Sequence, residues 1–245
     1  MECVWIAYGM RHDACPLSGV RAERCLGIKR CGFAAQDISV ALPRHLGMPP
    51  AGIFGKAKAM DAALLVIDLQ EEFARRTASG RARSNPGAEV AVAEVLALFR
   101  REGWPVVHVH HDDPRPGSAF RRDKPGYAPM ACAAPIAGEA VFVKSTSGAF
   151  ASTELAEWLR ACGISRLVVV GASVNHCVSS TVRSGFDLGF RMAMVKDAVF
   201  GFDLTGADGR VIDPETVLEV VFSTLTPELA ASLRASEVAS WMRAG

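Results

Sequence analysis

Five short, mostly apolar runs constrain the fold of this chain more than any other feature of its sequence. The first, Ala62–Ile67, has no polar side chain, which is typical of a strand buried on both faces of a parallel sheet. The others are Val106–His110, Ala140–Val143, Arg166–Val170 and Met192–Val195. Segments with helical patterns separate most of them, which indicates crossover connections. We predict an α/β fold: an open, mostly parallel six-stranded sheet in the order 3-2-1-4-5-6, with helices on both faces.

Capping residues and apolar stripes predict the helices. Asn85 offers an N-cap, Pro86 the first helical position and Gly103 the end of the first helix. Three more helices are expected to begin near Thr153, Asn175 and Asp213. The residues expected to face the core in the last two include Val178, Val182, Phe186, Val217, Val220, Val221 and Leu225. A sixth short strand near Ser232-Leu233 would complete the sheet.

Residues 1–59 differ from the rest of the chain. They contain eight Lys or Arg and four Asp or Glu residues, whereas the remaining 186 residues contain 19 and 22. None of their apolar runs is long or periodic enough to anchor a core. Two interpretations compete. The segment is either a loosely ordered extension with a regulatory role, or it is not part of the natural protein, which would then begin at Met60. We favour the second, because so little apolar surface does not offset the entropy of ordering it, and we assign the domain to residues 60–245.

Charge and hydropathy exclude several classes of function. The formal net charge is +1, which gives no electrostatic footprint for nucleic acid or a membrane surface. No run approaches the ~20 apolar residues of a spanning helix, and residues 1–5 lack the basic-then-apolar order of a signal peptide. We therefore expect a cytoplasmic protein whose partner is a small-molecule substrate. Thiols stay reduced in that compartment, so the seven cysteines are free thiols, metal ligands or catalysts.

Three residues with complementary chemistry follow three of the predicted strands: Asp68, Lys144 and Cys177. In open parallel sheets, ligands bind at the carboxyl ends of the strands, where the strand order reverses. Asp68 and Cys177 would then face each other across one crevice. The start of a helix and the Lys144 ammonium would lower the pKa of the thiol, while Asp68 would accept its proton. The Cys177 N–H and another from the turn at residues 172–174 would hold the oxyanion of a tetrahedral intermediate.

Other motifs carry less weight. Residues 50–57 hint at a phosphate-binding loop but lack its first Gly and its Ser or Thr. His108, His110 and His111 have no further ligand at fixed spacing, which favours packing or substrate contact over a metal site. Two non-hydrolytic alternatives remain. One is a non-catalytic protein that binds a small molecule or a partner, and the other is a redox protein that uses Cys177 with a resolving cysteine.

Four segments resemble the isochorismatase-like cysteine hydrolase family. They are residues 65–70 (Leu-Val-Ile-Asp-Leu-Gln) with Phe73, residues 143–150 (Val-Lys-Ser-Thr-Ser-Gly-Ala-Phe), residues 171–178 (Gly-Ala-Ser-Val-Asn-His-Cys-Val) and residues 189–198. These segments look like the family's opening strand, its lysine segment, its nucleophile turn and the strand that follows. The resemblance covers about residues 60–240 and leaves the first 59 without a counterpart.

The resemblance implies a catalytic triad of Cys177, Asp68 and Lys144 that needs no metal or other cofactor. It also implies a cis peptide between Ala172 and Ser173, which would point the Ser173 and Cys177 N–H groups into the oxyanion hole. Family members often form dimers or tetramers, so a homo-oligomer is expected. The residues expected to contact the substrate are Phe73, His110, Phe150 and His176.

Departures from the family pattern narrow the substrate. Isochorismatases proper lack the cysteine, so Cys177 indicates hydrolysis of an amide or other acyl C–N bond through a thioester acyl-enzyme. Nicotinamidases carry an Asp-x-His metal motif where residues 108–113 read His-Val-His-His-Asp-Asp, which argues against nicotinamide. Gly148 stands where Ser or Asn is common. A lactam, a carbamoyl compound or a small primary amide would each suit.

Overall fold

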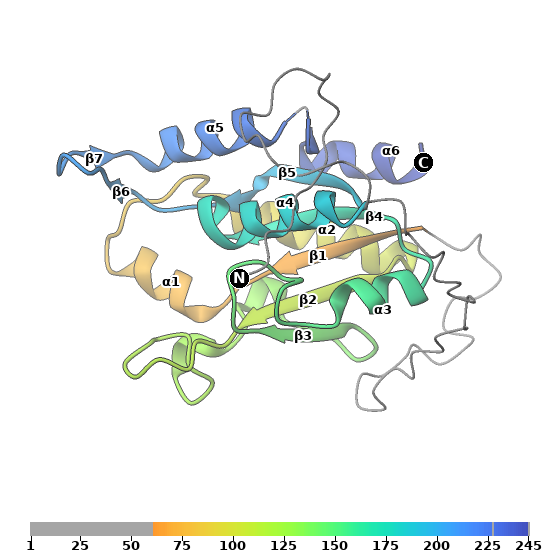
Figure 1. Ribbon diagram of the computed structural model, residues 1–245, viewed down its shortest axis with the longest axis horizontal. Coiled ribbons are helices and arrows are strands. Elements are labelled where there is room, and N and C mark those ends of the chain that lie inside the picture. Colours follow the sequence, from red (N-terminus) through yellow and green to blue (C-terminus); the bar gives the residue numbers. More distant parts are fainter. Residues whose placement is uncertain (1–60, 227, 245) are drawn as a thin grey trace, which may run out of the picture. The chain divides into compact units, whose positions relative to one another are not determined.

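A six-stranded parallel sheet forms the centre of the part of the chain that the computed structural model describes, residues 61–226 and 228–244 (Figure 1). Its order is β3-β2-β1-β4-β5-β8, and all neighbouring pairs are parallel. The strands are β1 (Ala62–Ile67), β2 (Val106–His111), β3 (Ala140–Lys144), β4 (Arg166–Ala172), β5 (Arg191–Phe200) and β8 (Ala230–Leu233). The predicted fold class and strand order are confirmed. A small antiparallel hairpin, β6 (Leu204–Thr205) and β7 (Val211–Ile212), precedes the sixth strand.

Helices cover both faces of this sheet. They are α1 (Glu71–Ala78), α2 (Ala88–Glu102), α3 (Leu155–Ala161), α4 (Ser179–Asp187), α5 (Pro214–Leu225) and α6 (Val238–Arg243). Helices α2 and α6 share one core cluster with Leu64 and Val66 of β1. Leu65 and Ile67 point to the opposite face and are equally buried, since successive side chains of a strand alternate. This two-sided burial explains why β1 is a continuous apolar run.

Two helices begin later than their capping residues predict. Asn85 adopts a φ of 47°, and its side-chain amide donates to the carbonyl oxygens of Lys196 and Val199, both at 2.6 Å. It therefore ties the loop before α2 to β5, and Gly87 precedes the helix instead. Thr153 also lies outside its helix, although its Oγ1 accepts from the Leu155 N–H at 3.2 Å. Of these N-terminal residues, only Asp213 caps its helix as predicted, because its side chain accepts from the Thr216 N–H at 2.9 Å.

Two side chains predicted to face the core lie at the surface. Phe186 of α4 is 43% exposed and Val220 of α5 is 59% exposed. A four-residue step advances about 40° around a helix beyond one full turn, so Phe186 has rotated roughly 80° from Val178. In α5, the buried face is formed by Val217, Leu218, Phe222 and Leu225. Val220 falls on the far side of that face.

Apart from short 3₁₀ turns, the elements that were not predicted are α1, the β6–β7 hairpin and α6. Helix α1 has one buried residue, Phe73, and therefore shows no repeating apolar stripe. No helix in the described ranges is long and apolar enough to cross a membrane. The predictions for residues 1–59 lie outside the described residues.

Candidate active site

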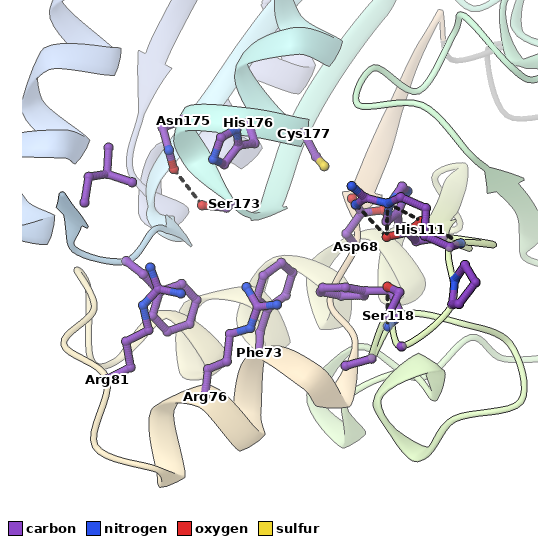
Figure 2. A pocket seen from close by; sticks show the side chains of 18 residues that line it. Asp68, Phe73, Arg76, Arg81, His111, Ser118, Ser173, Asn175, His176 and Cys177 are labelled. Carbon is purple, nitrogen blue, oxygen red and sulfur yellow. Dashed lines mark hydrogen bonds and ion pairs between the residues drawn. The ribbon is translucent and has the colours of Figure 1, made fainter. Parts of the chain in front are cut away.

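Asp68, Lys144 and Cys177 meet at the carboxyl end of the sheet. Figure 2 shows Asp68 and Cys177 beside the cavity that they line. Asp68 follows β1, Lys144 ends β3, and Cys177 lies in a π-helical turn, Val174–Val178, between β4 and α4. Lys144 Nζ lies 2.7 Å from Asp68 Oδ2 and 3.3 Å from Cys177 Sγ. Lys144 thus contacts both of the other residues predicted from the strand ends.

The backbone around the site brings β4 very close to β1. Gly171 has a φ of 129°, and a Cβ added there would lie 2.1 Å from the carbonyl oxygen of Ile67. Only glycine tolerates both that backbone conformation and that approach. Asp68, which directly follows Ile67 at the end of β1, adopts a φ of 50°. The peptide bond between Ala172 and Ser173 is cis, as the resemblance implied.

Lys144 is completely buried, and its ammonium contacts several acceptors. Besides Asp68 and Cys177, it donates to the Thr146 carbonyl oxygen at 3.1 Å and lies 3.4 Å from His111 Nδ1. A buried ammonium is costly unless it is paired and hydrogen-bonded, and a buried carboxylate is costly for the same reason. Asp68, which is 1% exposed, and Lys144 therefore stabilise each other's charge.

The pKa of Cys177 differs from the one expected. Burial, together with the negative charge of Asp68, raises the pKa of the thiol to about 12, and the opposing effect of Lys144 is smaller. The helix start and Lys144 were expected to lower it. Burial also raises the pKa of Asp68, against the influence of Lys144 and the Cys177 thiol. Burial therefore favours a protonated thiol over a stored thiolate and makes the Asp68 carboxyl group more basic than an exposed one.

A cavity of about 640 Å³ opens beside this cluster. Asp68, Cys177 and Ser173 line one side of it, and Phe73, Phe120 and Phe202 supply apolar surface. Lys144 does not line the cavity, although its Nζ contacts both Asp68 and Cys177. A small molecule that fits this cavity can therefore contact the Cys177 thiol and the Asp68 carboxylate. The Lys144 ammonium acts on it only through these two groups.

The four residues expected to contact a substrate divide into two pairs. Phe73 and His176 line the cavity. His110 does not, because it points to the other face of β2, where its ring packs edge-on against Tyr127 with centroids 6.2 Å apart. Phe150 stacks on Phe190, with ring centroids 5.6 Å apart, and also lies outside the cavity.

His111, for which the sequence favoured packing or substrate contact, lies at the site. It lines the cavity, and burial, aided by the Lys144 charge, lowers the pKa of its imidazole, so the neutral ring can accept from the ammonium. Gln70 holds the end of β2 by donating to the His111 and Tyr127 carbonyl oxygens at 3.0 and 2.9 Å. His111 also pairs in register with Lys144 across β2 and β3.

The remaining histidine of this strand is structural. His108 is buried, and its Nε2 lies 2.8 Å from Glu139 Oε2, which Arg100 also contacts. Within the described ranges, no group of three or more His, Cys, Asp or Glu side chains is arranged to hold a metal ion.

Comparisons with known proteins agree on one family. A family model described as isochorismatase domain matches residues 62–211. The uncharacterized isochorismatase family protein YrdC of Bacillus subtilis is 29% identical over 72% of this chain and 93% of its own length. The maleamate amidohydrolase of Pseudomonas putida is 32% identical over 56% and 71%. A crystal structure assigned to the family from Chromobacterium violaceum superimposes with a TM-score of 0.71 at 32% identity, covering 77% of this chain and 97% of that one. The chain belongs to the isochorismatase family.

Proposed function

We propose that this chain is a cysteine hydrolase that cleaves an amide or other acyl C–N bond of a small molecule through a thioester acyl-enzyme. The observation that carries the proposal is that Asp68 and Cys177 line one cavity and that Lys144 contacts both of them from outside the lining. The similarity to a maleamate amidohydrolase supports the choice of an amide.

The first half of the reaction forms the thioester. The Cys177 Sγ attacks the substrate carbonyl while Asp68 accepts the thiol proton, because a thiol with a pKa of about 12 holds almost no thiolate at neutral pH. Backbone N–H groups of Ser173 and Cys177 hold the oxyanion. Asp68 then gives its proton to the leaving nitrogen as the C–N bond breaks, which releases ammonia or an amine.

The second half hydrolyses the thioester. Water enters the vacated position and attacks the acyl carbon while Asp68 accepts one of its protons. The C–S bond breaks, the proton returns to the Cys177 sulfur, and the product leaves as a carboxylic acid. Lys144 keeps Asp68 charged between steps and stabilises the sulfur when it carries negative charge, since it donates to Sγ at 3.3 Å.

A panel of small amides, lactams and carbamoyl compounds tests the proposal, with release of ammonia or of a new carboxylate as the readout. We expect at least one compound to turn over and Cys177→Ala to abolish that turnover. Cys162→Ala is the matched control, because Cys162 is a half-buried free thiol outside the cavity. Undiminished turnover in Cys177→Ala would contradict the cysteine mechanism, and a panel with no turnover would favour a ligand-binding role.

A further inference from the structure

Three arginines line the cavity beside Cys177, and one of them is already neutralised there. Arg115 contacts Asp113 through two nitrogens, Nη2 at 2.7 Å and Nε at 2.9 Å, and Asp113 lines the same cavity. The Arg115 side chain is also 83% exposed. This pair contributes no net charge to the cavity wall.

Arg76 and Arg81 are arranged differently. Arg76 contacts Glu72 Oε1 through Nε at 2.8 Å, and Arg81 contacts Asp203 Oδ1 through Nε at 3.0 Å. Neither Glu72 nor Asp203 is among the residues that line the cavity. Among the described residues, the terminal nitrogens of Arg76 have no hydrogen-bond partner. Arg81 also donates through Nη2 to the Asp203 carbonyl oxygen at 3.0 Å. The two acidic residues hold the guanidinium groups from outside the cavity lining, and both guanidinium groups point toward the cavity (Figure 2).

Aromatic rings lie beside both of these guanidinium groups. The Arg76 Cζ lies 5.6 Å from the Phe73 ring centroid and 5.3 Å from that of Phe120. The Arg81 Cζ lies 5.1 Å from the Phe202 centroid. All three rings line the cavity. An arginine held on a ring loses little side-chain entropy when it binds a ligand, so this wall is organised before an anion arrives.

We propose that Arg76 and Arg81 form an anion subsite, so the substrate class is a small amide that carries a carboxylate remote from the bond that is cleaved. This inference rests on the proposed function. The amide carbonyl lies at Cys177, and the carboxylate lies against the arginines, which project toward the cavity from α1 and the segment that follows it (Figure 2). Arginine recognises carboxylates through paired, charge-assisted hydrogen bonds. The same wall disfavours cationic amides.

Matched pairs of substrates test the subsite. Succinamate and glutaramate carry a carboxylate, whereas succinamide and glutaramide have the same length without the charge. We expect the anionic compound of each pair to have the higher kcat/KM. Arg76→Gln and Arg81→Gln should each lower the ratio of anionic to neutral kcat/KM about tenfold, the effect of one charge-assisted hydrogen bond. Arg75→Gln is the control, because Arg75 is an exposed arginine of α1 that does not line the cavity.

A binding measurement separates this inference from the proposed reaction. Succinate and glutarate should protect Cys177 from alkylation by iodoacetamide, and the protection should be lost in Arg76→Gln and Arg81→Gln but kept in Arg75→Gln. Thermal midpoints confirm that the variants are folded. Equal kcat/KM for the anionic and neutral compounds, or loss of protection in Arg75→Gln as well, would overturn the subsite. No turnover of any compound would contradict the amidase activity, and protection would still decide the subsite.

Discussion

Asp68 has two opposite effects on Cys177. Its charge raises the pKa of the thiol. In the mechanism we propose, it is also the group that accepts the thiol proton during attack. Asp68→Asn should therefore lower turnover by about two to four orders of magnitude, which is the range expected when a general base is lost. The same variant should alkylate faster with iodoacetamide at pH 8, because removing the negative charge lowers the thiol pKa and increases the thiolate fraction. Slower alkylation together with retained turnover would contradict this role.

Lys144 makes the buried charge of Asp68 tolerable. Lys144→Ala leaves a carboxylate without its partner and should lower the free energy of unfolding at pH 7 by about 3–5 kcal/mol. The pKa of Asp68, already raised by burial, rises further in the variant, so the folded state binds a proton more tightly than the unfolded state. Lys144→Ala is therefore less stable than the wild type at high pH, and this deficit shrinks as the pH falls through the pKa of Asp68.

Urea denaturation of Lys144→Ala at several pH values checks this prediction. The double variant Asp68→Asn/Lys144→Ala is the control, because it removes both charges and should be more stable than Lys144→Ala alone. A deficit that is independent of pH, or that grows in the double variant, would show that Lys144 stabilises the fold by packing alone.

At the scale of elements, the approach of β4 to β1 positions Cys177 relative to Asp68. Gly171→Ala would place a Cβ against the Ile67 carbonyl oxygen at a φ that other residues rarely adopt. We expect it to lower the free energy of unfolding by at least about 1–3 kcal/mol and to reduce turnover. Gly87→Ala is the control, because it has a negative φ and open space around its Cβ. Equal stability of the two variants would contradict the account of this strand pair.

The strands could be predicted more completely than the helices, for a physical reason. Burial on both faces leaves a continuous apolar run, such as Ala62–Ile67, which needs no knowledge of the partners. Helix starts depend on which group a capping side chain contacts, and Asn85 bonds instead to β5, which is distant in sequence. The proximity of Asp68, Lys144 and Cys177 followed from the strand ends. The pKa of Cys177 did not, because it depends on burial among residues from several elements.

At the scale of the whole molecule, the domain should fold without its first residues. Asp61 accepts from the Ser165 and Arg166 N–H groups through its carbonyl oxygen, and its carboxylate pairs with the Arg166 side chain, so a chain that begins at Met60 keeps these contacts. We expect its thermal midpoint and turnover to equal those of the full chain. A midpoint lower by more than a few degrees would show that residues 1–59 pack on the domain.

Sedimentation velocity of both chains would test the predicted homo-oligomer.

The most direct test of the mechanism is to trap the acyl-enzyme. The wild type is mixed with an amide that it hydrolyses, and the reaction is quenched in acid within the first turnover. The protein is then digested, and the masses of its peptides are measured by mass spectrometry. We predict that the peptide with Cys177 gains the mass of the substrate acyl group and that ammonia or amine appears at the same rate as this adduct. Product formation with no adduct on Cys177 at any quench time, together with turnover by Cys177→Ala, would contradict the mechanism.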